Sequence, residues 1–165
     1  ERMLRPIRSL MFLCLAGCAF VVAPAQVQAQ SPNRLAVFGK STISIVSGDK
    51  THSFRVELAL THQQQMQGLM FRRRMAPDAG MLFVYKREEP IAMWMKNTYI
   101  PLDMLFIARD GKIVKIAERT VPLSQATISS GGEVVAVLEL NAGTASRLGI
   151  GPGDRVQATA LGTAP

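Results

Sequence analysis

The sequence predicts a mainly β fold of the α+β class: a small curled sheet or partly open barrel with two short helices. Three observations predict it. Short β-type runs recur along the chain, an Asp-Gly hairpin signal joins two of them, and two helix-cap patterns interrupt the series. The chain has 165 residues, enough for one domain to bury a core of its own.

Eight runs rich in β-branched, aromatic and aliphatic residues predict the strands. They are residues 42–46, 54–60, 81–85, 91–95, 102–108, 113–117, 134–140 and 156–160. Asp110-Gly111 lies between the fifth and sixth runs, so these two should pair antiparallel. The run 91–95 is apolar throughout, which predicts a strand covered on both faces.

Two cap patterns predict the helices. Thr61 followed by Gln64 fits a capping box, and the helix that it opens should run to about Gly68. Asn141 is expected to cap a second helix over residues 142–148, which Gly149 would end.

The amino terminus has the three zones of an export signal. A basic start (Arg2, Arg5 and Arg8) precedes the uncharged apolar run 10–23, and Val27-Gln28-Ala29 then fits a cleavage site before Gln30. We therefore expect residues 1–29 to be a signal peptide and the working domain to be periplasmic or secreted. Residues 30–40 are expected to form a flexible leader, and residues 41–161 a single β-rich domain.

A second interpretation of the same segment predicts lipid anchoring instead of soluble release, in the same compartment. Leu15-Ala16-Gly17-Cys18 resembles a bacterial lipobox, in which the cysteine becomes lipidated. The alternative localisation is therefore lipid-anchored through Cys18, and a membrane association is expected only in that case. The apolar residues 19–23 favour soluble release, because a tether usually turns polar after its cysteine.

Composition excludes several classes of protein. Both cysteines, Cys14 and Cys18, fall in the predicted signal peptide, which excludes disulfides, thiol catalysis and cysteine zinc sites from the mature domain. Loss of residues 1–29 lowers the net charge from +7 to +5, a balance that favours anionic ligands or surfaces. Few aromatic residues and no groove-reading motif make nucleic-acid binding an unfavoured function, and no cofactor is predicted.

One polar cluster stands out. Asp103 interrupts the apolar run 102–107, and a buried carboxylate costs several kcal/mol unless it is paired or hydrogen-bonded. The nearest groups that could satisfy it belong to Lys96, Asn97 and Thr98. These residues predict either a polar pocket floor beside the Trp94 ring or a buried structural pair that fixes the loop to the sheet.

Residues 92–103, Ala-Met-Trp-Met-Lys-Asn-Thr-Tyr-Ile-Pro-Leu-Asp, closely resemble the signature of an exported prokaryotic family, domain of unknown function 192 (DUF192). Residues 67–72, 80–83, 137–143 and 149–156 resemble its other blocks. The resemblance implies a compact β-rich fold with one or two short helices. It implies no activity, because none is established for the family.

Arg72-Arg73-Arg74 could grip a phosphate, sulfate or carboxylate. Such a run is more often a solvated turn, and of the three only Arg72 matches the family block. Arg72 is therefore predicted at the rim of the pocket.

Two alternative functions have weaker support. Met93-Trp94-Met95 contains two thioethers and an indole, which could hold Cu(I). Glu139 interrupts another apolar strand, and together with Asp103 it could act as the acid and base of a hydrolase. Enzymatic activity is not favoured, because no recognised nucleophile or metal motif accompanies these carboxylates.

The favoured hypothesis is an extracytoplasmic, non-enzymatic binding module for a small polar or anionic ligand, such as an envelope saccharide. The predicted ligand-binding residues are Trp94, Lys96, Asn97, Thr98, Asp103 and Arg72. A segment of an envelope protein could instead occupy the same surface at a sheet edge.

Overall fold

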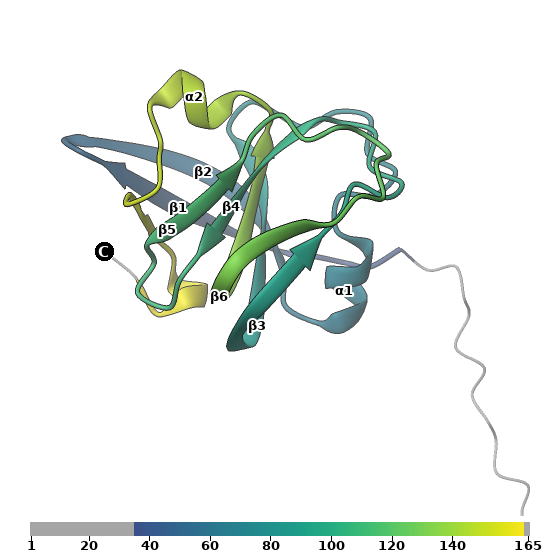
Figure 1. Cartoon of the computed structure of the whole chain (residues 1–165), viewed down its shortest axis with the longest axis horizontal. Coiled ribbons are helices and arrows are strands. Elements are labelled where there is room, and N and C mark those ends of the chain that lie inside the picture. The colour runs from purple at the N-terminus through teal and green to yellow at the C-terminus, as the bar shows by residue number, and fades with distance from the viewer. Residues whose placement is uncertain (1–34, 164–165) are drawn as a thin grey trace, which may run out of the picture. The chain divides into compact units, whose positions relative to one another are not determined.

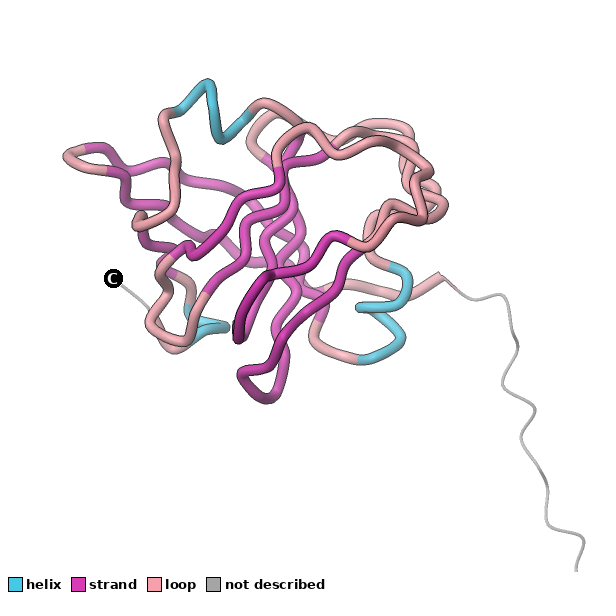
Figure 2. The backbone as a smooth tube through the Cα atoms, in the orientation of Figure 1, coloured by secondary structure: helices cyan, strands magenta, loops and turns pink. Residues whose placement is uncertain are grey.

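Strands dominate the computed structural model, which describes residues 35–163 (Figures 1 and 2). The elements are β1 (Gly39–Ser47), β2 (Lys50–Ala59), α1 (His62–Gln67), β3 (Ala79–Met93), β4 (Leu102–Ile107), β5 (Ile113–Ala117), β6 (Ile128–Asn141), α2 (Thr144–Leu148), β7 (Arg155–Gln157) and a 3-10 turn, η1 (Thr159–Leu161). The predicted signal peptide, Cys18 and the first residues of the predicted leader lie outside the described residues. Across residues 35–163, no helix has the length and apolar character that a membrane crossing requires.

The seven strands form one curled sheet in the order β5-β4-β6-β3-β2-β1-β7. Neighbouring strands are antiparallel except β2 and β3, which are parallel and are joined through α1. The curl brings the two edge strands together: Lys112 and Arg155 form an isolated bridge, and the Ile113 N–H donates to the Asp154 carbonyl at 2.8 Å. This confirms the predicted curled sheet with two short helices.

The predicted hairpin is confirmed between β4 and β5. Gly111 has a φ of +84°, a backbone conformation that favours glycine. The Asp110 carboxylate accepts a hydrogen bond from the Lys112 N–H at 3.0 Å and closes the turn.

β3 differs from the prediction in a way that shapes the site. The sequence predicted two strands, 81–85 and 91–95, and the structure has one strand that bends. Its register with β6 shifts between Val84 and Glu89 and again between Pro90 and Ala92. The expectation that residues 91–95 are covered on both faces is wrong, because Ala92 and Trp94 are exposed at the end of the bent strand.

The capping box of α1 is confirmed, since the side chains of Thr61 and Gln64 each accept from the other's backbone N–H. The predicted cap of α2 is wrong. Gly143 is the N-cap, and the Asn141 side chain ends β6 by donating to the Ala76 carbonyl at 2.8 Å. The last predicted strand is also shorter than expected, because the chain turns into η1 after β7.

The central strand β6 separates two hydrophobic cores. Leu138 and Leu140 pack on one side, in the core that includes Ala145 of α2. Val137 packs on the other side, with Met81 and Phe83 of β3. Because side chains alternate along a strand, successive residues of β6 from Ala136 to Leu140 face the two cores in turn.

Candidate functional site

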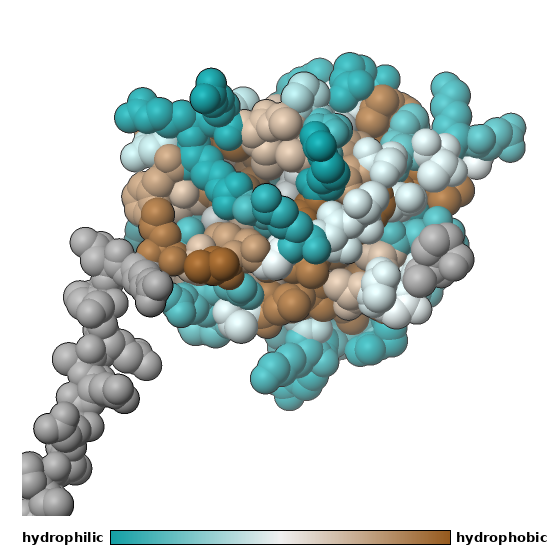
Figure 3. Space-filling view, turned by 180° about the vertical axis from the view of Figure 1, so that it is seen from behind, coloured by the Kyte–Doolittle hydropathy of each residue, from teal (hydrophilic) through white to brown (hydrophobic). Residues whose placement is uncertain are grey.

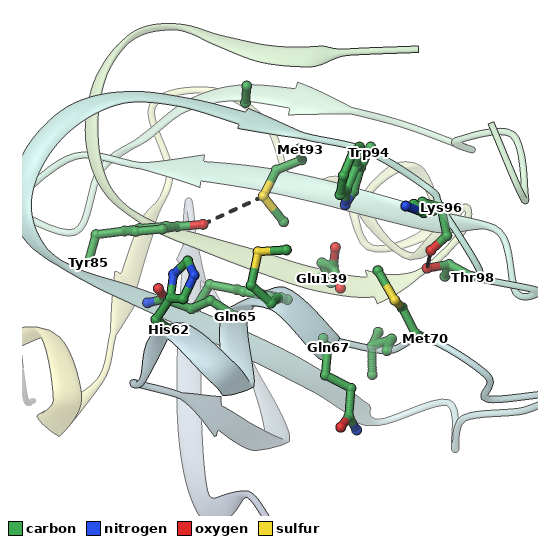
Figure 4. Close-up of a pocket in the computed structure, with 15 residues that line it drawn as sticks. His62, Gln65, Gln67, Met70, Tyr85, Met93, Trp94, Lys96, Thr98 and Glu139 are labelled. Atoms are coloured by element: carbon green, nitrogen blue, oxygen red, sulfur yellow. Dashed lines mark hydrogen bonds between the residues drawn. The ribbon is translucent and has the colours of Figure 1, made fainter. Parts of the chain in front are cut away.

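A cavity of about 250 Å³ lies between α1 and the second of these cores (Figure 4). Met66 and Met70, from α1 and the turn after it, line one wall. The two halves of the bent β3 supply Tyr85 and Met93 for another, and Glu139 of β6 lies in the interior. The bend in β3 is what allows one strand to contribute from both halves.

Glu139 is the chemically unusual residue of this cavity. Its side chain is 4% exposed, and it has no hydrogen-bond or ion-pair partner among residues 35–163. Burial raises the pKa of Glu139 to about 8, since charging a carboxyl there costs hydration that no partner replaces. Near neutral pH, the cavity therefore presents a protonated acid that can donate one hydrogen bond and accept others.

The side chains around Glu139 are held by their own contacts. The Tyr85 hydroxyl donates to the Met93 thioether at 3.6 Å. Burial, and then the nearby Glu139 and Glu89 carboxylates, raise the pKa of Tyr85 to about 12, so its phenol remains protonated. Gln65 donates to the Val84 carbonyl at 2.8 Å, which fixes its side-chain amide against β3.

Three of the predicted site residues line this cavity: Trp94, Lys96 and Thr98. The Lys96 ammonium lies 5.2 Å from the centroid of the Trp94 ring, within the range of a cation–π contact. Thr98 is buried, and its hydroxyl donates to the Lys96 carbonyl at 3.2 Å. The structure thus places an exposed indole and an ammonium group at the mouth of the cavity.

Asp103 does not line the cavity. Its carboxylate is fully buried and accepts from three backbone N–H groups, those of Arg119 at 2.9 Å, Gly143 at 3.0 Å and Ala145 at 2.9 Å. The expectation that Lys96, Asn97 and Thr98 satisfy Asp103 is therefore wrong. The sequence could not reveal that the start of α2, 40 residues away, supplies two of the three donors.

The hydrolase arrangement is also wrong. Asp103 pairs with Leu140 across the β4–β6 ladder, and Met104 pairs with Glu139. Directly opposed residues point to the same face of a sheet, and successive residues point to opposite faces. The carboxylates of Asp103 and Glu139 thus face different cores and cannot act across one pocket.

Asn97 and Arg72 lie outside the cavity. The Asn97 carbonyl accepts from the Phe71 N–H at 2.8 Å, so this residue joins two loops. Arg72 lies 2.5 Å from the Glu57 carboxylate and stacks over the Phe38 ring, and it lines a separate hollow of about 410 Å³. The prediction that Arg72 lies at the rim of the pocket with Trp94 is therefore wrong.

Met93 and Met95, the predicted copper pair, belong to the same core but do not both line the cavity. Met95 is fully buried, and its sulfur accepts from the Thr120 hydroxyl at 3.1 Å, whereas Met93 lines the cavity. The thioethers that share the cavity with Met93 are those of Met66 and Met70. Within residues 35–163, no group of three or more His, Cys, Asp or Glu side chains is positioned to hold a metal ion.

Sequence reasoning identified Glu139 as an anomaly but assigned it the wrong partner. An acidic residue inside the apolar run 134–140 was the available signal, and the face that it occupies depends on strand pairing. Tyr85, Met66 and Met70 gave no comparable signal, because tyrosine and methionine are ordinary core residues.

We expect Asp103→Asn to destabilise the domain by about 3 kcal/mol, because an amide cannot accept all three N–H groups and turns its own N–H₂ toward a donor. Chemical denaturation measures this loss. The matched control is Asp49→Asn in the exposed β1–β2 turn, where little change is expected. A loss for Asp103→Asn no larger than the control's would contradict the structural role.

We expect Glu139→Gln to stabilise the domain relative to wild type as the pH rises. The unfolded Glu139 carboxyl loses its proton near pH 4.5, whereas the folded one holds it to about pH 8. Wild-type stability should therefore fall between these pH values, by an amount on the order of 3 kcal/mol at pH 7, and the Gln variant should escape this loss.

Denaturation of both proteins at pH 4.5, 7 and 8.5 tests this expectation. Glu133→Gln, an exposed position on the same strand, serves as the control. A stability difference between Glu139→Gln and wild type that stays constant across the three pH values would show that Glu139 titrates normally.

Two crystal structures from bacteria resemble this domain closely. One, from Sinorhizobium meliloti 1021 and described as a candidate transcription regulator, is 52% identical, with a TM-score of 0.74 over 76% of this chain and 98% of that chain. The other, a protein of unknown function from Novosphingobium aromaticivorans DSM 12444, is 36% identical, with a TM-score of 0.71 over 74% and 94%. Among curated proteins, none matches the chain.

The family model of DUF192, described as an uncharacterised family, matches residues 43–158, from β1 to just beyond β7. This range contains both cores, the cavity and every block on which the resemblance in the sequence rests. The chain belongs to the DUF192 family.

Proposed function

We propose that this domain is a non-enzymatic binding module whose cavity takes a small polar or anionic molecule. The observation that carries the proposal is the carboxyl of Glu139, buried in the cavity without a partner among the described residues. Glu139 is not among the described residues whose polar side-chain atoms are sealed from solvent without a partner, so its carboxyl borders the cavity, where a ligand would supply its hydrogen bonds.

The size of the cavity favours a small occupant. Ligand pockets commonly measure roughly 300–1,000 Å³, and this one, at about 250 Å³, falls just below that range. A molecule of monosaccharide size suits it better than a nucleotide or a peptide. The exposed edge of Trp94 at the mouth offers an apolar surface for a sugar ring.

The charges favour an anionic form of such a molecule. An ionised Glu139 would repel an anion, whereas the protonated acid can donate a hydrogen bond to one. The Lys96 ammonium at the mouth adds a positive charge that is not engaged in an ion pair within residues 35–163. An acidic saccharide of the cell envelope would suit both groups, because its anionic group could accept hydrogen bonds from Glu139 and Lys96.

The export pattern at the amino terminus supports an extracytoplasmic location for this activity, whether by release or by lipidation of Cys18. The description of the Sinorhizobium relative suggests a different function, transcription regulation. The described part of this chain offers little for it, because α1 and α2 span six and five residues and a groove-reading helix is longer.

Cu(I) binding is the second candidate, on a revised set of ligands. The thioethers of Met66, Met70 and Met93 line the same cavity as Trp94, and soft sulfur ligands select Cu(I). The two candidates differ in the residues that they need, since copper requires the thioethers and an acidic saccharide requires Lys96 and Glu139.

Trp94 is the only tryptophan of the chain, so its fluorescence reports directly on the cavity mouth. We expect a saturable change on titration with glucuronate and a weaker response to glucose. Lys96→Met should weaken glucuronate binding about tenfold, because it removes a charged hydrogen-bond donor and keeps the aliphatic stem. Lys50→Met, at the exposed start of β2, is the matched control.

The pH dependence sharpens this test. Wild-type affinity for glucuronate should fall as the pH rises through 8, and Glu139→Gln should bind without that fall. No fluorescence response to either sugar would count against the saccharide class. A response to Cu(I) under reducing conditions that Met70→Leu and Met93→Leu abolish would favour the copper candidate.

A further inference from the structure

Three loops meet at one end of the domain, next to the mouth of the cavity. They are residues 68–78 between α1 and β3, 94–101 between β3 and β4, and 118–127 between β5 and β6, and we name them together the loop end. Backbone hydrogen bonds join them: the Phe71 N–H donates to the Asn97 carbonyl at 2.8 Å, and the Leu123 N–H to the Thr98 carbonyl at 3.0 Å. Figures 1 and 2 show loops gathered at the upper right of the domain.

The loop end carries unusual backbone conformations. Among residues 35–163, the non-glycine residues with positive φ are Phe71, Asn97, Arg119 and Leu123, with φ between 49° and 67°, and all four belong to it. A left-handed conformation costs a bulky residue roughly 1–2 kcal/mol. Such outliers persist where the surrounding structure holds them, and they concentrate at functional sites.

Two of these four residues also expose apolar side chains to solvent. Phe71 is 52% exposed and Leu123 is 53% exposed, and the adjacent loop residues Val121 and Tyr99 are 69% and 44% exposed. Asparagine would adopt the same backbone with less strain and without exposing apolar surface. A cluster of exposed apolar side chains on linked loops marks an interaction surface.

Positive charge surrounds these apolar side chains. The three loops contain five basic residues, Arg72, Arg73, Arg74, Lys96 and Arg119, and two acidic residues, Asp78 and Glu118. The Arg73 guanidinium lies 5.6 Å from the centroid of the Tyr99 ring. Figure 3, viewed from behind, shows hydrophobic and hydrophilic side chains interspersed on this face of the domain.

We propose that the loop end docks on an anionic lipid bilayer surface. Phe71, Tyr99, Val121 and Leu123 would enter the interface between headgroups and acyl chains, while Arg73, Arg74 and Arg119 contact lipid phosphates. Charge complementarity selects this occupant. The three loops carry five basic residues against two acidic ones, and an anionic bilayer matches this positive excess while its headgroup–acyl boundary accepts the exposed aromatic and aliphatic groups.

This docking does not depend on the proposed ligand. Phe71, Tyr99, Val121 and Leu123 do not line the Glu139 cavity. Loss of saccharide binding would therefore leave the membrane proposal standing, and the reverse also holds.

Co-sedimentation of the domain, residues 30–165, with vesicles tests the proposal. Vesicles that contain phosphatidylglycerol should bind it, and vesicles of phosphatidylcholine alone should bind about tenfold less. Phe71→Asn with Leu123→Asn should abolish binding to the anionic vesicles and leave thermal stability equal or higher, because asparagine tolerates a positive φ. Leu60→Asn, an exposed apolar position outside the loops, is the matched control.

The charge test compares two triple variants with the same change in net charge. Arg73, Arg74 and Arg119 changed to Gln should lower binding about tenfold, and Lys40, Lys50 and Arg87 changed to Gln should have little effect. Equal losses in the two triples would overturn the proposal, as would equal binding to both kinds of vesicle. Failure to bind anionic vesicles would also overturn it and would leave a protein partner as the occupant of the loop end.

Discussion

Burial of β6 on both faces is the constraint on which this structure depends. The strand pairs with β3 on one side and β4 on the other, and residues Val134–Leu140 are buried. Because its side chains alternate between two cores, a polar residue on β6 or on a neighbouring strand faces either one core or the other. Asp103 faces the core with α2 and has three backbone donors there, whereas Glu139 faces the core with α1 and has none. The first is a fixed structural carboxylate, and the second is an acid available to a ligand.

The bend in β3 allows this strand to enclose Glu139 in the cavity. A straight strand could not flank the cavity with both Tyr85 and Trp94, and the register shifts against β6 allow the chain to turn between them. The same geometry places the two proposed binding surfaces apart on the domain. The cavity lies between α1 and β3, while the exposed apolar side chains and arginines lie on the loops at one end. A domain that docks on a bilayer through those loops would hold its ligand cavity close to the membrane surface.

Local signals predicted the fold well, because turn chemistry and cap patterns act over a few residues. The Asp110-Gly111 hairpin and the Thr61–Gln64 capping box are confirmed. Long-range contacts explain the errors: Asn141 binds the loop before β3 instead of capping α2, and Asp103 meets α2 instead of Lys96. Of the predicted site, Trp94, Lys96 and Thr98 gather at one cavity because they are neighbours in sequence. Glu139 could not be assigned to that cavity without the pairing of β4, β6 and β3.

The central claim is that Glu139 is a protonated acid facing a ligand cavity, and its titration tests that claim most directly. Carbon-13 NMR of glutamate-labelled protein would follow each side-chain carboxyl with pH, with the signal of Glu139 assigned by its absence from Glu139→Gln. Our account predicts a midpoint near pH 8 for this signal. A midpoint near pH 4.5, the ordinary value for glutamic acid, would contradict it, because an ionised carboxylate would then occupy the cavity at neutral pH.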